Sequence, residues 1–221
     1  NLIAHRGRTL PWEESVTLRH VIRMREAPLP AGAPVDPGIT GAVIVIGQGQ
    51  LTSRLLECLG VPSFSVQSRS DLAAIEVPLP HLIITMAAES EAKTDLAGWT
   101  RRRELLRQTY WICQEWYRRL LDQGLLGQAS LTAVTRMGGD LGLSGQIESA
   151  EGGAVTGLLK ALGVENWGSG QPQIAIRAID VEADLEVDEV VAVVMAEMSV
   201  SRYELEVCWQ QGRRMVPCLV A

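Results

Sequence analysis

Long hydrophobic runs and an excess of positive charge are both missing from this sequence. The longest apolar runs, Gly41–Ile46 and Val190–Ala196, fall well short of the roughly 20 residues that a membrane-spanning helix requires. The 20 Lys and Arg residues are outnumbered by 26 Asp and Glu residues, which gives a net charge of −6, whereas nucleic acid partners usually require a basic face. The sequence therefore argues against membrane and nucleic acid partners and favours a cytoplasmic protein.

Cysteine and histidine are also scarce. The four cysteines form no Cys-x-x-Cys pair, and the three histidines are equally dispersed: Cys58, Cys113, Cys208, Cys218, His5, His20 and His81. This spacing supports neither a zinc site nor a disulfide framework, so we expect free thiols, as in an intracellular compartment, and no bound metal. Residues 1–10 contain neither the apolar segment of a secretory signal nor an initiator Met, which favours a fragment of a longer polypeptide.

The first 38 residues differ in pattern from the rest of the chain. Arg residues are interspersed with Val, Leu and Ile between Val16 and Met24, which predicts a strand or an arm on another element. A connector rich in proline and glycine follows at 27–38. We therefore divide the chain into an N-terminal arm with a Pro-rich linker from a preceding domain, 1–38, and a folded domain, 39–221.

Regular secondary structure is predicted from Gly41 onward. Strands of β-branched or apolar residues alternate with segments whose apolar residues recur at helical spacing. The predicted strands are 42–46, 63–66, 81–87, 129–134 and 174–179, the predicted helices are 51–59, 96–123, 152–164 and 187–198, and a hairpin is predicted from 203–209 and 215–220 around 211–212. Strands that alternate with helices predict βαβ units. The expected fold is an α/β, doubly wound and mostly parallel sheet flanked by helices, with a C-terminal β-hairpin.

The first candidate site is the turn after strand 42–46, which contains Gly47 and Gly49. A strand, a glycine turn and a helix are the context of a dinucleotide fingerprint, in which backbone N–H groups hold a pyrophosphate. That fingerprint also needs a third glycine, but 51–53 reads Leu-Thr-Ser, and Gln67 stands where an acidic residue would bind the ribose. Asp71 is a poor substitute. We therefore interpret the turn as a tight βα connection without a cofactor.

Two later segments carry a family resemblance. The strand end Ser130–Gly139 and the helix Glu148–Glu165 resemble the core of the short-chain dehydrogenase/reductase family, whose helix carries a Gly-Leu-x-Lys-x-Leu-x-x-Glu tail like that of Gly157–Glu165. In that family a serine at the strand end orients the carbonyl of the substrate. A Tyr-x-x-x-Lys motif on the helix supplies the proton donor and the ammonium that lowers the pKa of the tyrosine.

The resemblance places changed residues at every one of these catalytic positions. The serine position falls on Thr135, the tyrosine position on Glu148 and the lysine position on Gly152. A carboxylate does not replace an activated phenol, and glycine supplies no charge. The Asn-Asn-Ala-Gly segment of the family likewise becomes Thr-Met-Ala-Ala at 85–88. We therefore expect no catalytic residues and no metal site, with Thr135, Glu148 and Gly152 as degenerate positions.

One subfamily matches this combination better than free-standing reductases do. Segments 135–142, 151–160, 178–180 and 204–220 resemble the ketoreductase region of modular polyketide and polyunsaturated fatty acid synthases. That region consists of two Rossmann-like halves: a truncated structural subdomain without a nucleotide site, and a catalytic subdomain that carries the cofactor. The resemblance implies that this chain is the truncated Rossmann-like structural half, a pseudoenzyme.

The implied function is non-catalytic bracing within a biosynthetic multidomain synthase. The isolated chain would be no enzyme and would bind no cofactor, although the parent synthase would be an NADPH-dependent ketoreductase/acyltransferase system. The implied partners are adjacent synthase domains: the catalytic ketoreductase half, a dehydratase or a methyltransferase. Two alternatives stay open. The first is a divergent NADPH-dependent oxidoreductase that uses Gly47 and Gly49, and the second is a docking module for an acyl carrier protein that uses Arg101–Arg103.

Two further clusters have a structural interpretation beside a functional one. Five aromatic residues crowd the helix 96–123, where packing on the sheet or on a partner is favoured over a substrate platform: Trp99, Tyr110, Trp111, Trp116 and Tyr117. Five acidic residues lie near the start of helix 187–198, where they offset the helix dipole, with a metal site as the alternative: Glu182, Asp184, Glu186, Asp188 and Glu189.

Overall fold

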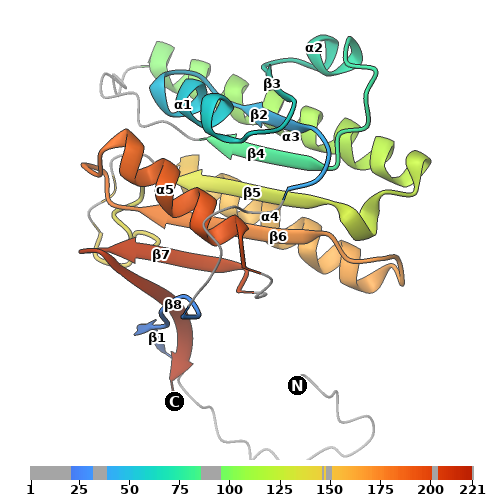
Figure 1. The fold of residues 1–221 in the computed structure, drawn as a ribbon. Coiled ribbons are helices and arrows are strands. Elements are labelled where there is room, and N and C mark those ends of the chain that lie inside the picture. Colours follow the sequence, from blue (N-terminus) through green and yellow to red (C-terminus); the bar gives the residue numbers. More distant parts are fainter. Residues whose placement is uncertain are drawn as a thin grey trace, which may run out of the picture.

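An eight-stranded sheet with helices on both faces forms the body of the protein (Figure 1). The computed structural model describes residues 21–31, 39–85, 96–145, 147, 151–200 and 204–220. The strands are β1 (Val21–Glu26), β2 (Val43–Ile46), β3 (Ser63–Val66), β4 (His81–Thr85), β5 (Ser130–Thr135), β6 (Ala175–Val181), β7 (Glu206–Gln210) and β8 (Arg213–Val220). The helices are α1 (Gln50–Cys58), α2 (Arg69–Ala73), α3 (Leu96–Gln123), the short 3₁₀ helix η2 (Leu126–Gln128), α4 (Glu151–Gly168) and α5 (Val187–Met198).

The strand order confirms the truncated, mostly parallel Rossmann-like fold. The sheet runs β1-β8-β7-β6-β5-β4-β2-β3, and the pairs from β3 to β7 are parallel. The Rossmann order 3-2-1-4-5-6 has one more strand beyond the second. Here the sheet ends at β3, because the chain between β3 and β4 contains only the short helix α2. Sequence periodicity missed α2, whose capping box uses Ser68 and Asp71.

Burial on both faces explains why the central strands carry continuous apolar side chains. All residues of β2 and β4 are buried, as parallel strands covered by helices require. Residues of α3 and α4, such as Ile112 and Leu159, pack against one face of the sheet. Residues of α1 and α5, such as Leu55 and Val194, pack against the other (Figure 1). Within the described residues, no helix combines the length and the apolar character of a membrane span.

The C-terminal hairpin is confirmed, and a strand from the predicted arm joins it. β7 and β8 are antiparallel around Gln211 and Gly212, which have φ values of 52° and 71°, as a type I′ turn requires. β1 pairs antiparallel with β8 and forms the edge of the sheet. Residues 1–20 and 32–38 of the predicted arm and linker lie outside the described residues, and the division at residue 38 stays a prediction.

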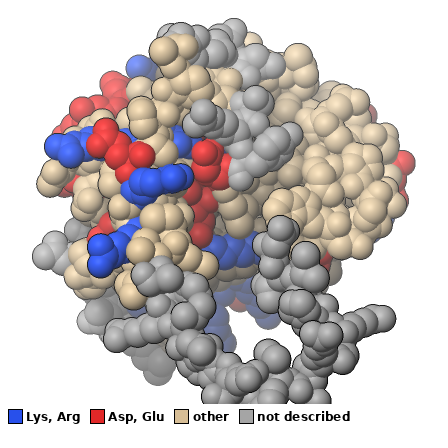
Figure 2. Space-filling model, turned by 90° about the horizontal axis from the view of Figure 1, so that it is seen from below, with Lys and Arg blue, Asp and Glu red and all other residues tan. Residues whose placement is uncertain are grey.

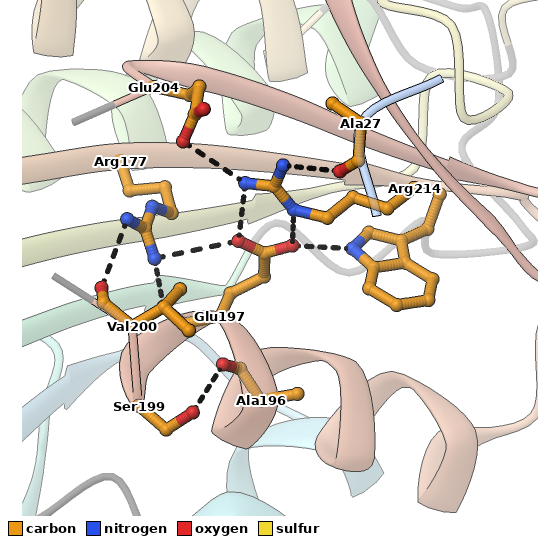
Figure 3. A network of polar contacts seen from close by, with 9 residues as sticks. Ala27, Arg177, Ala196, Glu197, Ser199, Val200, Glu204 and Arg214 are labelled. Carbon is orange, nitrogen blue, oxygen red and sulfur yellow. Dashed lines mark hydrogen bonds and ion pairs between the residues drawn. The ribbon is translucent and has the colours of Figure 1, made fainter. Parts of the chain in front are cut away.

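A buried ionic network fixes the hairpin to α5 and to the segment after β1 (Figure 3). Glu197 is fully buried and receives Arg214 on both oxygens, at 2.6 Å and 3.1 Å. The Trp209 indole N–H donates to the same carboxylate at 2.8 Å, and Arg177 pairs with it at 3.5 Å. Arg214 also donates to the Ala27 carbonyl oxygen at 2.8 Å. Burial lowers the pKa of Arg214, but the hydrogen bonds and negative charge of Glu197 outweigh this effect and raise it.

Candidate functional site

The glycine turn lies at the carboxyl edge of the sheet, where the direction of winding reverses. β2 pairs with β3 on one side and with β4 on the other, so the turn after β2 flanks the switch point at which open α/β sheets bind ligands. A Cβ atom at Gly47, which has a φ of 144°, would lie 1.9 Å from the Thr85 hydroxyl oxygen. Glycine at 47 is therefore required by close packing of the turn against β4.

A threonine occupies the place of the third fingerprint glycine. Thr52 is buried, and its hydroxyl lies 2.8 Å from the hydroxyl of Thr85, which also donates to the Ile46 carbonyl oxygen at 3.3 Å. In the dinucleotide fingerprint, the third glycine lets the helix pack closely on the strand. Here the side chains of Thr52 and Thr85 fill that contact, and their hydroxyl groups hydrogen-bond to each other. The geometry is that of a well-packed βα turn, while the absence of a cofactor site stays a prediction.

The predicted serine position is engaged inside the protein. Thr135 at the end of β5 is fully buried, and its hydroxyl donates to Asp180 Oδ1 at 2.7 Å. The same carboxylate accepts hydrogen bonds from the backbone N–H groups of Met137 at 2.7 Å and Leu141 at 2.9 Å. Burial raises the pKa of Asp180, and these hydrogen bonds act against the rise. The Asp180 carboxylate thus joins the Thr135 hydroxyl to the backbone of the loop after β5.

A side chain at the predicted lysine position would require its neighbours to shift. A Cβ atom at Gly152 would lie 2.8 Å from Met137 Cγ, 2.9 Å from Met137 Sδ and 3.0 Å from Thr135 Cβ. The structure therefore brings Thr135 and Gly152 together, as the family resemblance implies, but Met137 fills the space beside Gly152. Glu148, at the tyrosine position, and residues 86–88 lie outside the described residues. Sequence reasoning missed the role of Asp180, although its place at the end of an apolar strand is a usable signal.

A cavity of about 850 Å³ lies next to the glycine turn. It is lined by the end of β2 and the turn after it, by the residue that follows β3, and by α3 residues between 100 and 112: Ile46, Gly47, Gln48, Gln67, Thr100, Arg101, Glu104, Leu105, Gln108, Thr109 and Ile112. Helical spacing predicts Leu105 on the core face of α3, but 41% of this residue is exposed. The prediction is wrong for Leu105, because at this level α3 faces the cavity instead of packed side chains.

The basic triplet and the acidic cluster have internal partners. Arg102 pairs with Glu151 at the start of α4 at 2.5 Å, so one of the three arginines joins two helices. Glu186 and Glu189 form the capping box of α5, and Asp188 pairs with Arg54 of α1 at 2.7 Å. The hydrogen bonds that Arg54 donates to the carboxylates of Asp188 and Glu57 raise the pKa of Arg54. Among the described residues, no group of three or more His, Cys, Asp and Glu side chains is arranged to hold a metal ion.

The aromatic residues of α3 divide between the core and the surface. Trp116 is buried, and its indole N–H donates to the Leu79 carbonyl oxygen at 2.7 Å. Trp99, Tyr110 and Trp111 are 55%, 45% and 37% exposed. Packing on the sheet is therefore confirmed for Trp116, while packing of these three exposed side chains on a partner stays a prediction. Charge is unevenly distributed on the surface as well: Figure 2 shows both signs interleaved over one part of a face and few charged side chains over another.

Comparison with known proteins rests on structure alone. No protein family model matches the chain, and no curated protein matches it. A multidomain structure of adenylation, ketoreductase and pseudo Asub from a keto acid-selecting NRPS module has a TM-score of 0.66 and 16% identity, covering 91% of this chain and 18% of that chain. A-type ketoreductases from a modular polyketide synthase give 0.61 and 20%, covering 92% and 42%.

A third structure agrees with these two. An N-terminal ketoreductase from the macrolactin assembly line gives a TM-score of 0.57 and 13% identity, covering 91% of this chain and 44% of that chain. This chain has the fold found in ketoreductase structures. It spans less than half the length of each of the three chains. The fold resemblance predicted from the sequence segments is thereby confirmed.

Proposed function

We propose that this chain is the non-catalytic structural subdomain of a ketoreductase region in a multidomain polyketide synthase, where it braces neighbouring catalytic domains. The observation that carries the proposal is the packing around Gly152. A lysine at this position would have to displace Met137 and Thr135, whose atoms lie 2.8–3.0 Å from where its Cβ would stand. Without that ammonium, nothing at this position lowers the pKa of a proton-donating phenol.

The fold comparison supports the proposal in a second way. The chain covers 42% and 44% of two ketoreductase chains, which is the share expected of one of two Rossmann-like halves. The missing strand beyond β3 fits the truncated half rather than the half that carries the cofactor. This chain would thus have a structural role, and the other half of the ketoreductase region would carry out the reaction.

The bracing surface would include the exposed aromatic side chains of α3. Exposed large apolar side chains cluster on protein–protein interfaces, with Trp and Tyr enriched. Trp99, Tyr110 and Trp111 are such residues on α3, and Trp167 of α4 is 77% exposed. A catalytic domain that covers these side chains would gain apolar burial at little cost in conformational entropy.

A calorimetric titration with NADPH tests the non-catalytic part of the proposal. We expect no binding tighter than about 100 μM, which corresponds to about −5.5 kcal/mol, because the turn at Gly47 is filled by Thr52 and Thr85. Circular dichroism of the same sample verifies that the chain is folded. Micromolar binding that disappears in a Gly49→Val variant would favour the divergent reductase instead.

Charge introduction into the exposed aromatic surface tests the bracing part. Trp99→Glu in the full synthase should lower ketoreductase turnover, while the melting temperature of the isolated chain stays unchanged, because Trp99 is 55% exposed. Val77→Glu provides the matched control, since Val77 is 46% exposed and belongs to the segment between α2 and β4 rather than to α3. Equal turnover in the wild type and both variants would argue against bracing through this face.

A further inference from the structure

The cavity beside the glycine turn has an apolar floor. Ile46 at the end of β2 and Ile112 of α3 are 3% and 0% exposed and close its base. Leu105 lies on the same face of α3 as Ile112, two turns nearer the start of the helix, yet it is 41% exposed. A leucine that points into a cavity rather than into packed side chains can bury its apolar surface when a ligand binds there. The floor therefore favours an apolar ligand.

Uncharged amides lie at the edge of the same cavity. The Gln48 side-chain amide donates to the Gln67 carbonyl oxygen at 2.8 Å. The pair leaves the Gln48 carbonyl oxygen and the Gln67 amide nitrogen without a partner among the hydrogen bonds of the described residues, so one acceptor and one donor stand side by side. A neutral amide matches such an edge, because it presents one donor and one acceptor of its own.

The charges at the rim provide no net attraction for an ion. Arg101 and Glu104 carry opposite signs one helical turn apart. Glu104 accepts hydrogen bonds from Gln108 at 2.7 Å and from Arg107 at 3.1 Å, which lower the pKa of Glu104 and keep it ionised. Gly49 and the first residues of α1 are not among the residues that line the cavity. The lining residues therefore provide neither a helix N-terminus nor a net positive charge to bind an anion.

We propose that this cavity binds an uncharged, mainly apolar molecule that carries an amide group, such as the amide of a medium-length acyl chain. The chain of the ligand lies on Ile46, Leu105 and Ile112. Its polar group meets the Gln48–Gln67 pair. The volume of about 850 Å³ falls within the range of small-molecule sites, roughly 300–1,000 Å³. The site is independent of the proposed bracing function, which requires neither the cavity nor a ligand.

Octanamide and octanoate form a matched pair of probes, because they share a chain and differ in head-group charge. Titration of the ¹³C-methyl-labelled chain should give saturable shifts of the Leu105 and Ile112 methyl signals with octanamide. Binding of octanoate should be at least tenfold weaker. The absence of saturable shifts with octanamide would overturn the proposal, and equal binding of octanoate would overturn the assignment of an uncharged ligand.

Two leucines of the same helix supply the variant and its control. Leu105→Glu should weaken octanamide binding at least tenfold, whereas Leu121→Glu should leave it within twofold of wild type, because Leu121 is similarly exposed, at 44%, but does not line the cavity. Leu105→Trp, which fills the cavity without adding charge, should also weaken binding. This second variant keeps the test valid if Leu105→Glu fails to fold. Unchanged binding in both Leu105 variants would refute the site. Binding of NADPH would instead refute the proposed function and leave this result intact.

Discussion

Removal of the Glu197 carboxylate tests whether the buried ionic network holds the end of the sheet together. Glu197 is fully buried and Arg214 is 3% exposed. Among the described residues, Glu197→Ala would leave the guanidinium of Arg214 with Glu204, at 3.4 Å, and the Ala27 carbonyl oxygen as partners. The Trp209 indole N–H, now 2.8 Å from the carboxylate, would lose its acceptor.

The expected loss of stability is large for a single substitution. Breaking a buried ion pair on one side costs about 3–5 kcal/mol, because the remaining charge stays desolvated. For chains of 150–250 residues, each kcal/mol lowers the melting temperature by about 2–4 °C. The melting temperature of Glu197→Ala should therefore fall by about 6–20 °C. Glu197→Gln retains the volume and some hydrogen bonds, so its melting temperature should lie between those of wild type and Glu197→Ala.

Urea unfolding followed by circular dichroism measures the change in the free energy of unfolding. Glu57→Ala serves as the control, because Glu57 forms a solvent-exposed ion pair with Arg54, and such pairs contribute little. Hydrogen exchange at the Ala27 amide, which donates to the Arg214 carbonyl oxygen at 3.0 Å, should accelerate in Glu197→Ala. A loss below about 1 kcal/mol with unchanged exchange at Ala27 would show that the network does not fasten this segment.

Three further predictions concern packing, pH and thiol reactivity. Gly152→Ala should destabilise the fold by about 1–3 kcal/mol through overpacking. Gly157→Ala should instead stabilise α4 by up to about 1 kcal/mol, because a Cβ atom at Gly157 would meet nothing within 4 Å. Equal melting temperatures of the two variants would refute the packing argument. Burial lowers the pKa of His81 below its ordinary 6.5, although its hydrogen bond with the Thr40 carbonyl oxygen acts in the opposite direction. The unfolded chain then takes up this proton first as pH falls, so the free energy of unfolding should decrease from pH 6.5 toward the folded-state pKa, and His81→Gln should show a shallower decrease in urea titrations at pH 7.5 and 5.5. Burial raises the pKa of the Cys113 thiol to about 12, so a thiol reagent at pH 8 should modify the half-buried Cys58 and Cys218 first and reach Cys113 only on unfolding. Rapid modification of Cys113 in the native chain would contradict this.

The boundaries of most elements could be read from the sequence because their signals are local. Apolar periodicity placed the ends of α3 and α5 at the residues where the structure has them. Gly124, with a φ of 67°, ends α3 as its left-handed conformation allows. The Gln-Gly pair fixed the hairpin turn for the same reason. The family resemblance placed Thr135 and Gly152 at one site, and the structure brings them together.

The loss of a strand beyond β3 and the surroundings of the candidate site depended on tertiary packing. The short helix α2 lacks a periodic signal, and the sheet ends at β3 because the connection to β4 contains no further strand. Leu105 has the same sequence signal as Ile112, but only the placement of α3 against the sheet decides which of them faces a cavity. The partnership of Thr135 with Asp180, 45 residues apart, follows from the adjacency of β5 and β6. Local sequence thus determined where helices and strands begin and end, while long-range packing decided which side chains meet, because burial and hydrogen bonding depend on neighbours that periodicity does not encode.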